Sequence, residues 1–331
     1  MQFQWKSFSQ TRDIDFSTPE ISRQLQFWSL LIFGIPSLIC SLFLFYKYLF
    51  NSIRRHAIHN HSILIIISTN IILIVTDFSW MLDSLRHSGH VLSPTKSFCL
   101  IWWFLDFTLY STQTVILAWA SIERHILVFH NQILSTPRKR IYYHYLPLIV
   151  LLIYLICFYA GVIFMPPCEN GFEYLSVECG LNPCYLKLKY LPVWDAIVNS
   201  ALPTGIIAIF SVALLYRVIA HRTRLQQPIE WRKHRRMSIQ LLSLSSVYLF
   251  LNFPLTIIML VQLFQKPGPQ FGFGTQIYIF FLTYGVTLSL PFVIYLNYLS
   301  TEKQKHQRIT PFLTHNQHQR MYRQEPTMIQ S

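Results

Sequence analysis

Four acidic residues lie inside long apolar stretches of the chain, where a charge is unexpected. They are Asp77, Asp83, Asp106 and Asp195. A carboxylate placed in a membrane is expensive to bury and usually serves a function, such as holding a cation. Asp83 lies near the end of its stretch, where water can solvate it. We therefore expect Asp106 and Asp195 to face one cavity and to favour a cationic ligand.

Asp106 belongs to a stripe of side chains on one face of a predicted helix. The stripe, spaced by three and four residues, comprises Trp103, Asp106, Phe107 and Tyr110. Arg124 follows Asp106 by 18 residues, which is about five helical turns and about 27 Å. One helix face would therefore carry a ligand contact near one end and a basic group near the other.

Enzyme chemistry has no support in the sequence. The chain contains no His-Glu-x-x-His, no Gly-x-Ser-x-Gly and no phosphate-binding loop. The acids in the apolar stretches are not paired at the spacing that glycosidases use. We predict that the protein is not an enzyme, and we expect neither a cofactor nor a metal.

The composition points to a membrane protein. The net charge is +13, yet only 12% of the 331 residues are charged and 52% are hydrophobic. A soluble domain is about 25% charged, and a soluble nucleic-acid binder would carry its basic residues on a polar surface. We therefore expect no nucleic-acid partner. We also expect the basic residues to lie outside the lipid.

Seven stretches reach the roughly 20 apolar residues that a helix needs to cross a bilayer. They are Phe27–Phe50, Ile63–Leu85, Ser97–Phe129, Tyr145–Met165, Leu191–Ile219, Ser238–Phe264 and Thr275–Leu299. The predicted fold is an all-α bundle of seven transmembrane helices over residues 27–300. Residues 1–26 would form an N-terminal segment, and residues 301–331 a polar, disordered tail.

The basic residues predict the orientation of this bundle. With the N-terminus outside, 19 of the 27 lysines and arginines fall on the cytoplasmic side and 8 on the extracellular side. Membrane proteins favour basic residues in cytoplasmic loops. We expect an extracellular N-terminus, a cytoplasmic C-terminus, and a basic loop Arg217–Arg236 that contacts anionic lipid or a protein partner.

The end of the third stretch, Glu123-Arg124-His125, resembles the Asp/Glu-Arg-Tyr motif of rhodopsin-like (class A) G-protein-coupled receptors. In that family a cysteine precedes the motif arginine by 25 residues, as Cys99 precedes Arg124 here. Prolines at Pro203, Pro254 and Pro291 match the family's prolines in helices five, six and seven, where they kink the helix. The resemblance covers about residues 27–300.

The resemblance implies a receptor of the plasma membrane that signals to a heterotrimeric G protein through rearrangement of helices three and six. It also implies that Arg124 pairs with Glu123 at rest and is released to meet the G protein. A plain alternative is an arginine that extends its charge out of the lipid at a helix end.

The resemblance also bears on the ligand. In amine-binding members, an Asp at the position of Asp106 pairs with the ligand beside a helix-seven tyrosine, which Tyr284 matches. The Asp106–Tyr284 pair could instead be only an interhelical hydrogen bond. Because Asp195 and the acidic second loop with Glu169, Glu173 and Glu178 add negative charge, we favour a basic peptide, with an amine as the alternative.

Several positions depart from the family pattern. The sequence has Asn70 where the family has an acid, Leu290 in place of the asparagine before Pro291, and Leu251-Asn252-Phe253-Pro254 where the family usually has Cys-Trp-x-Pro. These differences indicate a divergent branch. They keep open a seven-helix protein that has lost coupling.

Four cysteines, Cys99, Cys168, Cys179 and Cys184, fall on the extracellular side, where disulfides persist. Four cysteines allow three pairings, which the sequence does not distinguish, and a zinc site is the alternative. The resemblance implies that Cys99 bonds to the second extracellular loop, through Cys179 or Cys184.

A transporter or channel is the other class of function that the acids allow. It would use Asp77, Asp106 and Asp195 as a cation path. Such proteins usually contain inverted repeats and broken helices. The seven unequal stretches show no sign of such repeats.

Overall fold

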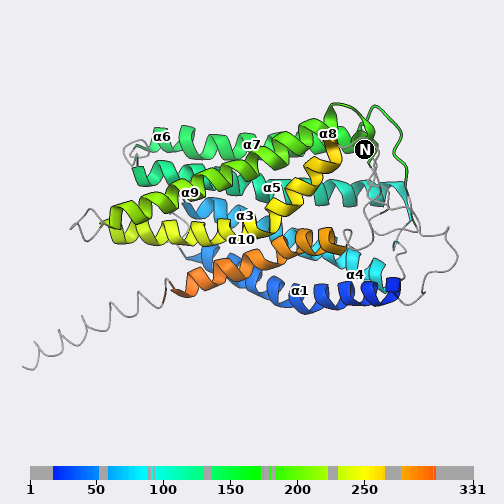
Figure 1. The fold of residues 1–331 in the computed structure, drawn as a ribbon, viewed down its shortest axis with the longest axis horizontal. Coiled ribbons are helices and arrows are strands. Elements are labelled where there is room, and N and C mark those ends of the chain that lie inside the picture. The colour runs from blue at the N-terminus through cyan, green and yellow to red at the C-terminus, as the bar shows by residue number, and fades with distance from the viewer. Residues whose placement is uncertain are drawn as a thin grey trace, which may run out of the picture.

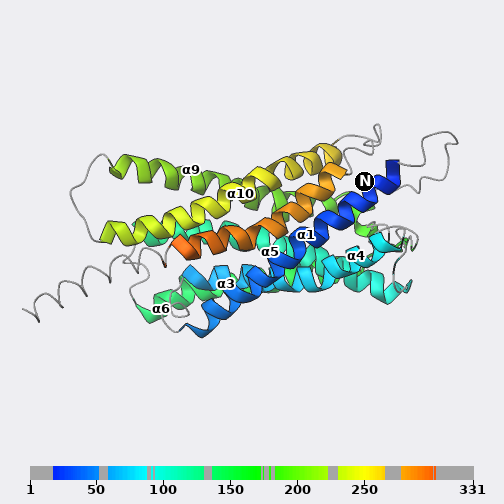
Figure 2. The ribbon, with the colours of Figure 1, turned by 90° about the horizontal axis from the view of Figure 1, so that it is seen from below.

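The computed structural model describes residues 18–51, 59–87, 91, 94–129, 136–172, 174, 179, 183–222, 230–264, 277–300 and 302. Over these residues the chain is helical, with short turns and connecting segments and no strand. The helices run roughly side by side along the long axis of the molecule (Figure 1; Figure 2). This arrangement confirms the prediction of an all-α bundle.

The described residues form seven long helical rods. Three of these rods contain a π-helical segment. In chain order the elements are α1 (Thr18–Phe50), α3 (His59–Leu73), η1 (Ile74–Phe78), α4 (Ser79–Arg86), α5 (Lys96–Phe129), α6 (Pro137–Arg140), η3 (Ile141–Tyr145), α7 (Leu146–Phe164), η5 (Cys184–Lys187), α8 (Leu191–Trp194), η6 (Asp195–Ala201), α9 (Leu202–Arg222) and α10 (Glu230–Phe264). The last rod is the helix Ile277–Ser300, drawn in orange in Figure 1.

Some rods begin before the apolar stretches that predicted them. α1 begins at Thr18, ahead of the predicted start at Phe27, and α10 begins at Glu230, ahead of Ser238. The backbone hydrogen bonds of a helix do not depend on apolar side chains, so a helix can extend beyond the apolar stretch that crosses the membrane. The residues after Thr18 are also a proline and a glutamate, which are favoured in a first helical turn. Residues 1–17, and the predicted tail 301–331 apart from Glu302, lie outside the described residues.

α5 differs from the other rods in its polarity. Six helices of the described residues are long and apolar enough to cross a membrane, and α5 is not one of them. Its 34 residues nevertheless run the length of the bundle. α5 lies in the middle of the bundle in both views and packs against α3, α7, α9 and α10 (Figure 1; Figure 2). The central helix is therefore surrounded by protein, which allows it to be polar.

The polar side chains of α5 find partners inside the bundle. Its buried polar residues around the middle are Thr108, Ser111, Thr112, Gln113 and Thr114. Thr112 donates to the carbonyl of Thr108 at 2.7 Å on its own helix. Gln113 Nε2 donates to Asn70 Oδ1 of α3 at 3.4 Å, and Asn70 Nδ2 donates to Ser41 Oγ of α1 at 3.2 Å. Hydrogen bonds thus connect three rods across the hydrocarbon layer.

Two disulfides lie at one end of the bundle. Cys99, in the first turn of α5, is bonded to Cys179, and Cys168 is bonded to Cys184. Of the pairings that the sequence left open, the structure therefore has Cys99 with Cys179. The segment between α7 and α8 is also held to α5 by the ring of Phe172, which stacks on Trp103 with centroids 5.1 Å apart. We call this end of the bundle the disulfide end.

Loss of the Cys99–Cys179 bond should destabilise the protein, because the bond closes a loop of 80 residues. We expect Cys99→Ser and Cys179→Ser each to lower the free energy of unfolding by about 2–4 kcal/mol. The measurement is thermal unfolding of the purified protein in detergent.

The double variant should be no less stable than either single variant, because the same bond is lost once. Cys157→Ser, which changes an exposed free cysteine, serves as the control and should unfold like the wild type. Additive losses at Cys99 and Cys179 would contradict the pairing.

Candidate ligand site and switch

The acidic residues predicted to bind a ligand lie toward the disulfide end. Asp106 is partly exposed on α5. It acts electrostatically on Tyr110 of the same helix and on Tyr185 of η5. Tyr185 is buried and reaches into the bundle from the segment that carries the disulfides. Asp106 therefore faces the space that this segment covers.

The Asp195 carboxylate receives three hydrogen bonds. Tyr159 of α7 donates to Oδ1 at 2.7 Å, Asn199 donates to Oδ1 at 2.8 Å, and Tyr185 donates to Oδ2 at 3.0 Å. Tyr159 in turn shares a hydrogen bond of 2.6 Å with Ser111 of α5. All three donors to the carboxylate are neutral groups, so they orient Asp195 without cancelling its charge.

Burial raises the pKa of Tyr185 well above the ordinary value of a tyrosine, and the neighbouring Asp195 carboxylate adds to the effect. Both causes disfavour the phenolate, because it would place a second negative charge in a dry site. The Tyr185 hydroxyl therefore remains protonated and acts as a donor to Asp195.

The backbone around Asp195 and Asn199 is irregular. Both lie in η6, a π-helical segment that leads directly into α9. Pro203 follows it and has no N–H to give to the preceding turn, so the regular α-helical pattern is already interrupted there. π-helical turns are often found at functional sites.

The other predicted ligand residues have separate partners. Trp103 is fully buried beneath Phe172. Tyr110 donates to Asn252 Oδ1 of α10 at 2.7 Å. Tyr284 packs edge-on against Phe78 with centroids 4.9 Å apart. The structure thus places Asp195 beside Tyr185, with Asp106 within electrostatic reach of the same tyrosine. Tyr110 contacts α10, and Trp103 and Tyr284 pack on other aromatic rings.

Asp77 is the partner of Tyr284 that the sequence did not reveal. Asp77 is buried in η1 and accepts hydrogen bonds from Trp102 Nε1, at 2.6 Å, and from Tyr284. Tyr284 thus acts on Asp77 as well, and the expected Asp106–Tyr284 pair stays a prediction. In the sequence, the position of Asp77 in an apolar stretch marks it as a buried acid. It does not show which residues donate hydrogen bonds to it.

A cavity of about 450 Å³ lies between α1 and the helix Ile277–Ser300. Its walls are mostly apolar side chains, including Leu30, Phe33, Phe281 and Leu288, with Tyr284 at one side. Neither Asp106 nor Asp195 lines it. We therefore base the ligand site on the carboxylates and not on this cavity.

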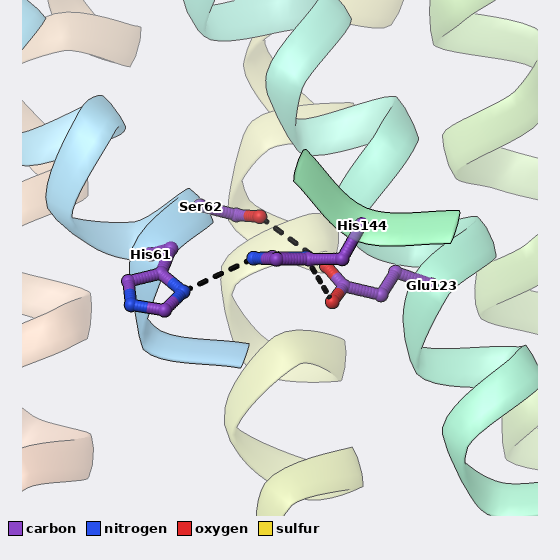
Figure 3. Close-up of polar contacts among 4 residues, drawn as sticks. All are labelled: His61, Ser62, Glu123 and His144. Carbon is purple, nitrogen blue, oxygen red and sulfur yellow. Dashed lines mark hydrogen bonds and ion pairs between the residues drawn. The ribbon is translucent and has the colours of Figure 1, made fainter. Parts of the chain in front are cut away.

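At the other end of α5, which we call the motif end, Glu123 and His144 form a buried pair. His144 Nδ1 of η3 lies 2.6 Å from Glu123 Oε1, and both side chains are buried. Ser62 Oγ of α3 donates to Glu123 Oε2 at 3.4 Å. His144 Nε2 is 3.0 Å from His61 Nδ1 of α3 (Figure 3). Side chains from three rods therefore meet at the Glu123 carboxylate.

These contacts correct the predicted pairing of Glu123 with Arg124. Within the described residues no ion pair joins the two side chains, although Glu123 acts electrostatically on Arg124. The physical reason is that His144 and Ser62 contact the two oxygens of the Glu123 carboxylate. Arg124 is only 3% exposed, and its Nη1 atom has no hydrogen-bond partner in the described part of the chain.

The rest of the predicted switch lies between α5, α9 and α10. His125 packs edge-on against Phe210 of α9 with centroids 5.4 Å apart. Pro254 lies inside α10, which bends partway along its length (Figure 1). Asn252, two residues before this proline, donates to Thr204 Oγ1 of α9 at 3.0 Å. In the last rod, the Pro291 carbonyl accepts a hydrogen bond of 3.4 Å from Cys40 Sγ of α1.

Sequence reasoning missed His61, His144 and Tyr159. Each is a polar residue within or beside an apolar stretch, which is a usable signal for a buried hydrogen bond. The sequence does not show which rods face one another, so their partners Glu123 and Asp195 could not be assigned.

Comparison with known families agrees with this architecture. Residues 48–293, from the end of α1 into the last rod, match the family model described as 7 transmembrane receptor (rhodopsin family). A search of curated proteins finds no match to the chain. The family match covers more than half of the chain. The matched residues include Cys99, Arg124 and the prolines Pro203, Pro254 and Pro291. The chain therefore belongs to the rhodopsin family of seven-transmembrane receptors.

Proposed function

We propose that this receptor transmits the binding of an extracellular cationic ligand to a heterotrimeric G protein through rearrangement of α5 and α10. Its family gives it a signalling role and makes it a multi-pass protein of the plasma membrane. The nature of the ligand, the direction of insertion and the residues of the switch are the parts that we propose.

The disulfide end is taken to face the outside. Two disulfides lie at this end, and disulfides persist in oxidising compartments. Lys47 in the last turn of α1 and the three basic residues of α6 lie at the motif end, as expected for the cytoplasmic side. The basic loop Arg217–Arg236, which we expect to contact anionic lipid or the G protein, has its side chains outside the described residues.

The observation that carries the ligand proposal is the presence of two carboxylates near Tyr185. Asp195 is held by neutral hydroxyl and amide donors, and Asp106 lies within electrostatic reach of the same tyrosine. Two carboxylates in a site of low polarity favour a cation more strongly than they would in water. Phe107 and Tyr110 add aromatic faces that can pack on an ammonium or guanidinium group. A basic peptide is the preferred ligand, and an amine is the alternative.

Arg124 supplies the other half of the proposal. Its guanidinium is buried in this structure, so a G protein can meet it only after the motif end opens. The bend of α10 at Pro254 gives that helix a place to swing. A ligand that binds the open arrangement better than the closed one would shift the equilibrium toward signalling.

The alternative functions receive less support. A cation path would need its acids in line, but Asp77 and Asp195 bind different neighbours on different rods. A protein that had lost coupling would be free to lose its switch, whereas Arg124 is retained and buried. The tests below separate these possibilities.

Asp106→Asn should weaken binding of the ligand, because the amide keeps the shape of the carboxylate and removes its charge. We expect the potency of an agonist, found by screening basic peptides and amines in cells that report several G-protein pathways, to fall about 10- to 100-fold. Asp83→Asn is the matched control, since Asp83 is paired with His87 at 3.3 Å near the surface. Equal potency for wild type and Asp106→Asn would remove Asp106 from the site.

Arg124→Ala should abolish the G-protein response while leaving cell-surface expression measurable. The reason is that the proposed switch depends on the guanidinium. Arg86→Ala, at an exposed position of α4, is the control and should signal like the wild type. A full response from Arg124→Ala would refute the switch. A ligand-independent cation current would instead favour the transporter.

A further inference from the structure

We propose that His144 is a positioning residue that holds Glu123 away from Arg124, so that burial, and not an ion pair within the Glu123-Arg124-His125 motif, restrains the arginine. The inference rests on the proposed coupling to a G protein. It assigns a role in that coupling to a histidine of the fourth rod and predicts a receptor with substantial basal signalling.

The geometry at Glu123 supports the first step. His144 Nδ1 lies 2.6 Å from Glu123 Oε1, within the range of an ion pair, although the two atoms do not have the geometry of a hydrogen bond. Ser62 donates to the other carboxylate oxygen. Both oxygens of Glu123 are therefore engaged by α3 and η3, on the side of α5 that faces those rods (Figure 3).

The second nitrogen of His144 is also engaged, which fixes the ring. His144 Nε2 is 3.0 Å from His61 Nδ1, and the two rings lie with centroids 5.2 Å apart. Tyr145 packs against both rings. A histidine that is held through one nitrogen presents the other in a defined direction. His61 thus orients His144, and His144 orients Glu123.

Arg124 is left with a different restraint. Its side chain is buried, its Nη1 atom has no hydrogen-bond partner within the described residues, and Glu123 and Tyr48 act on it electrostatically. When the motif end opens, the Arg124 guanidinium regains contact with water, and no ion pair with Glu123 has to be broken. Because a buried cation without a bound counter-ion is costly, the closed arrangement is only weakly favoured.

The decisive experiment is a four-variant cycle that measures basal G-protein activation per receptor at the cell surface, with a panel of G-protein reporters and no added ligand. His144→Leu releases Glu123 to pair with Arg124, so we expect basal signalling to fall several-fold. In the Glu123→Gln background, His144→Leu should cause no further fall, because the carboxylate that it would free is absent.

Two near-isosteric variants separate positioning from simple packing. The amide nitrogen of Asn can occupy the place of histidine Nδ1, and that of Gln the place of Nε2. We therefore expect His144→Asn to keep the contact with Glu123 and wild-type basal signalling. His144→Gln keeps only the contact with His61 and should behave like His144→Leu. His87→Leu, at an exposed histidine of the disulfide end, is the control for losing a histidine.

The outcomes distinguish the inference from the proposed function. An equal fall in basal signalling for His144→Leu with and without Glu123→Gln overturns the positioning role. A wild-type receptor that responds to an agonist but has no basal signal above empty cells also overturns it, and leaves the proposed function intact. A receptor that activates no G protein with or without ligand refutes the proposed function itself.

Thermal unfolding of the purified receptor tests the pairing without any coupling. His144→Leu removes the buried pair of His144 with Glu123 and should lower the melting temperature. His144→Asn, which keeps the contact with Glu123, should restore it. A melting temperature that His144→Leu leaves unchanged, or that His144→Asn does not restore, overturns the pairing.

Discussion

The hydrocarbon of a membrane offers no hydrogen-bond partners, so every polar group inside the bundle must find one in the protein. This constraint is concentrated on α5, the most polar of the seven rods. Because α3, α7, α9 and α10 surround it, α5 can carry threonines, a glutamine, an aspartate and an arginine without exposing them to lipid. The contacts that satisfy these groups also determine how the surrounding rods are placed. Gln113 reaches α1 through Asn70, and Ser111 reaches the Asp195 cluster through Tyr159.

The charges near the two ends of α5 are compensated differently. At the disulfide end the donors to Asp195 are neutral, and neutral donors orient a carboxylate while leaving its charge in place. At the motif end Glu123 meets a histidine, which can carry a positive charge, while the adjacent arginine has no comparable partner. In the proposed function, the acids at the disulfide end bind the ligand and the buried Arg124 at the motif end meets the G protein. Each is poised to gain an interaction from a molecule outside the bundle.

The sequence predicts the rods well, because membrane thickness and hydropathy act on each stretch separately. α5 was identified within one residue of its start, and Cys99 and Arg124 were recognised from their spacing alone. The partners of the polar side chains could not be predicted in this way. His144 lies 21 residues after Glu123, beyond a turn, and Tyr284 lies far from Asp77 in the chain. Which polar groups meet depends on how seven rods pack and on the π-helical segments η1, η3 and η6, each of which rotates the residues that follow it. No local pattern in the sequence announces such a segment.

Asn252 shows how a departure from the family pattern can be understood physically. It lies two residues before Pro254, at the position where related receptors usually have a bulky tryptophan. In place of the packing of a large ring, it makes hydrogen bonds to neighbouring rods. It accepts from Tyr110 of α5 and donates to Thr204 of α9, and Tyr248 of α10 hydrogen-bonds Thr114 one turn further along α5. The three rods are thus joined by polar contacts beside the bend of α10. Tyr110 is one helical turn from Asp106, so a ligand that moved Asp106 would act directly on this junction. In the proposed mechanism the signal passes from carboxylate to tyrosine to asparagine, and α10 moves when those hydrogen bonds are exchanged.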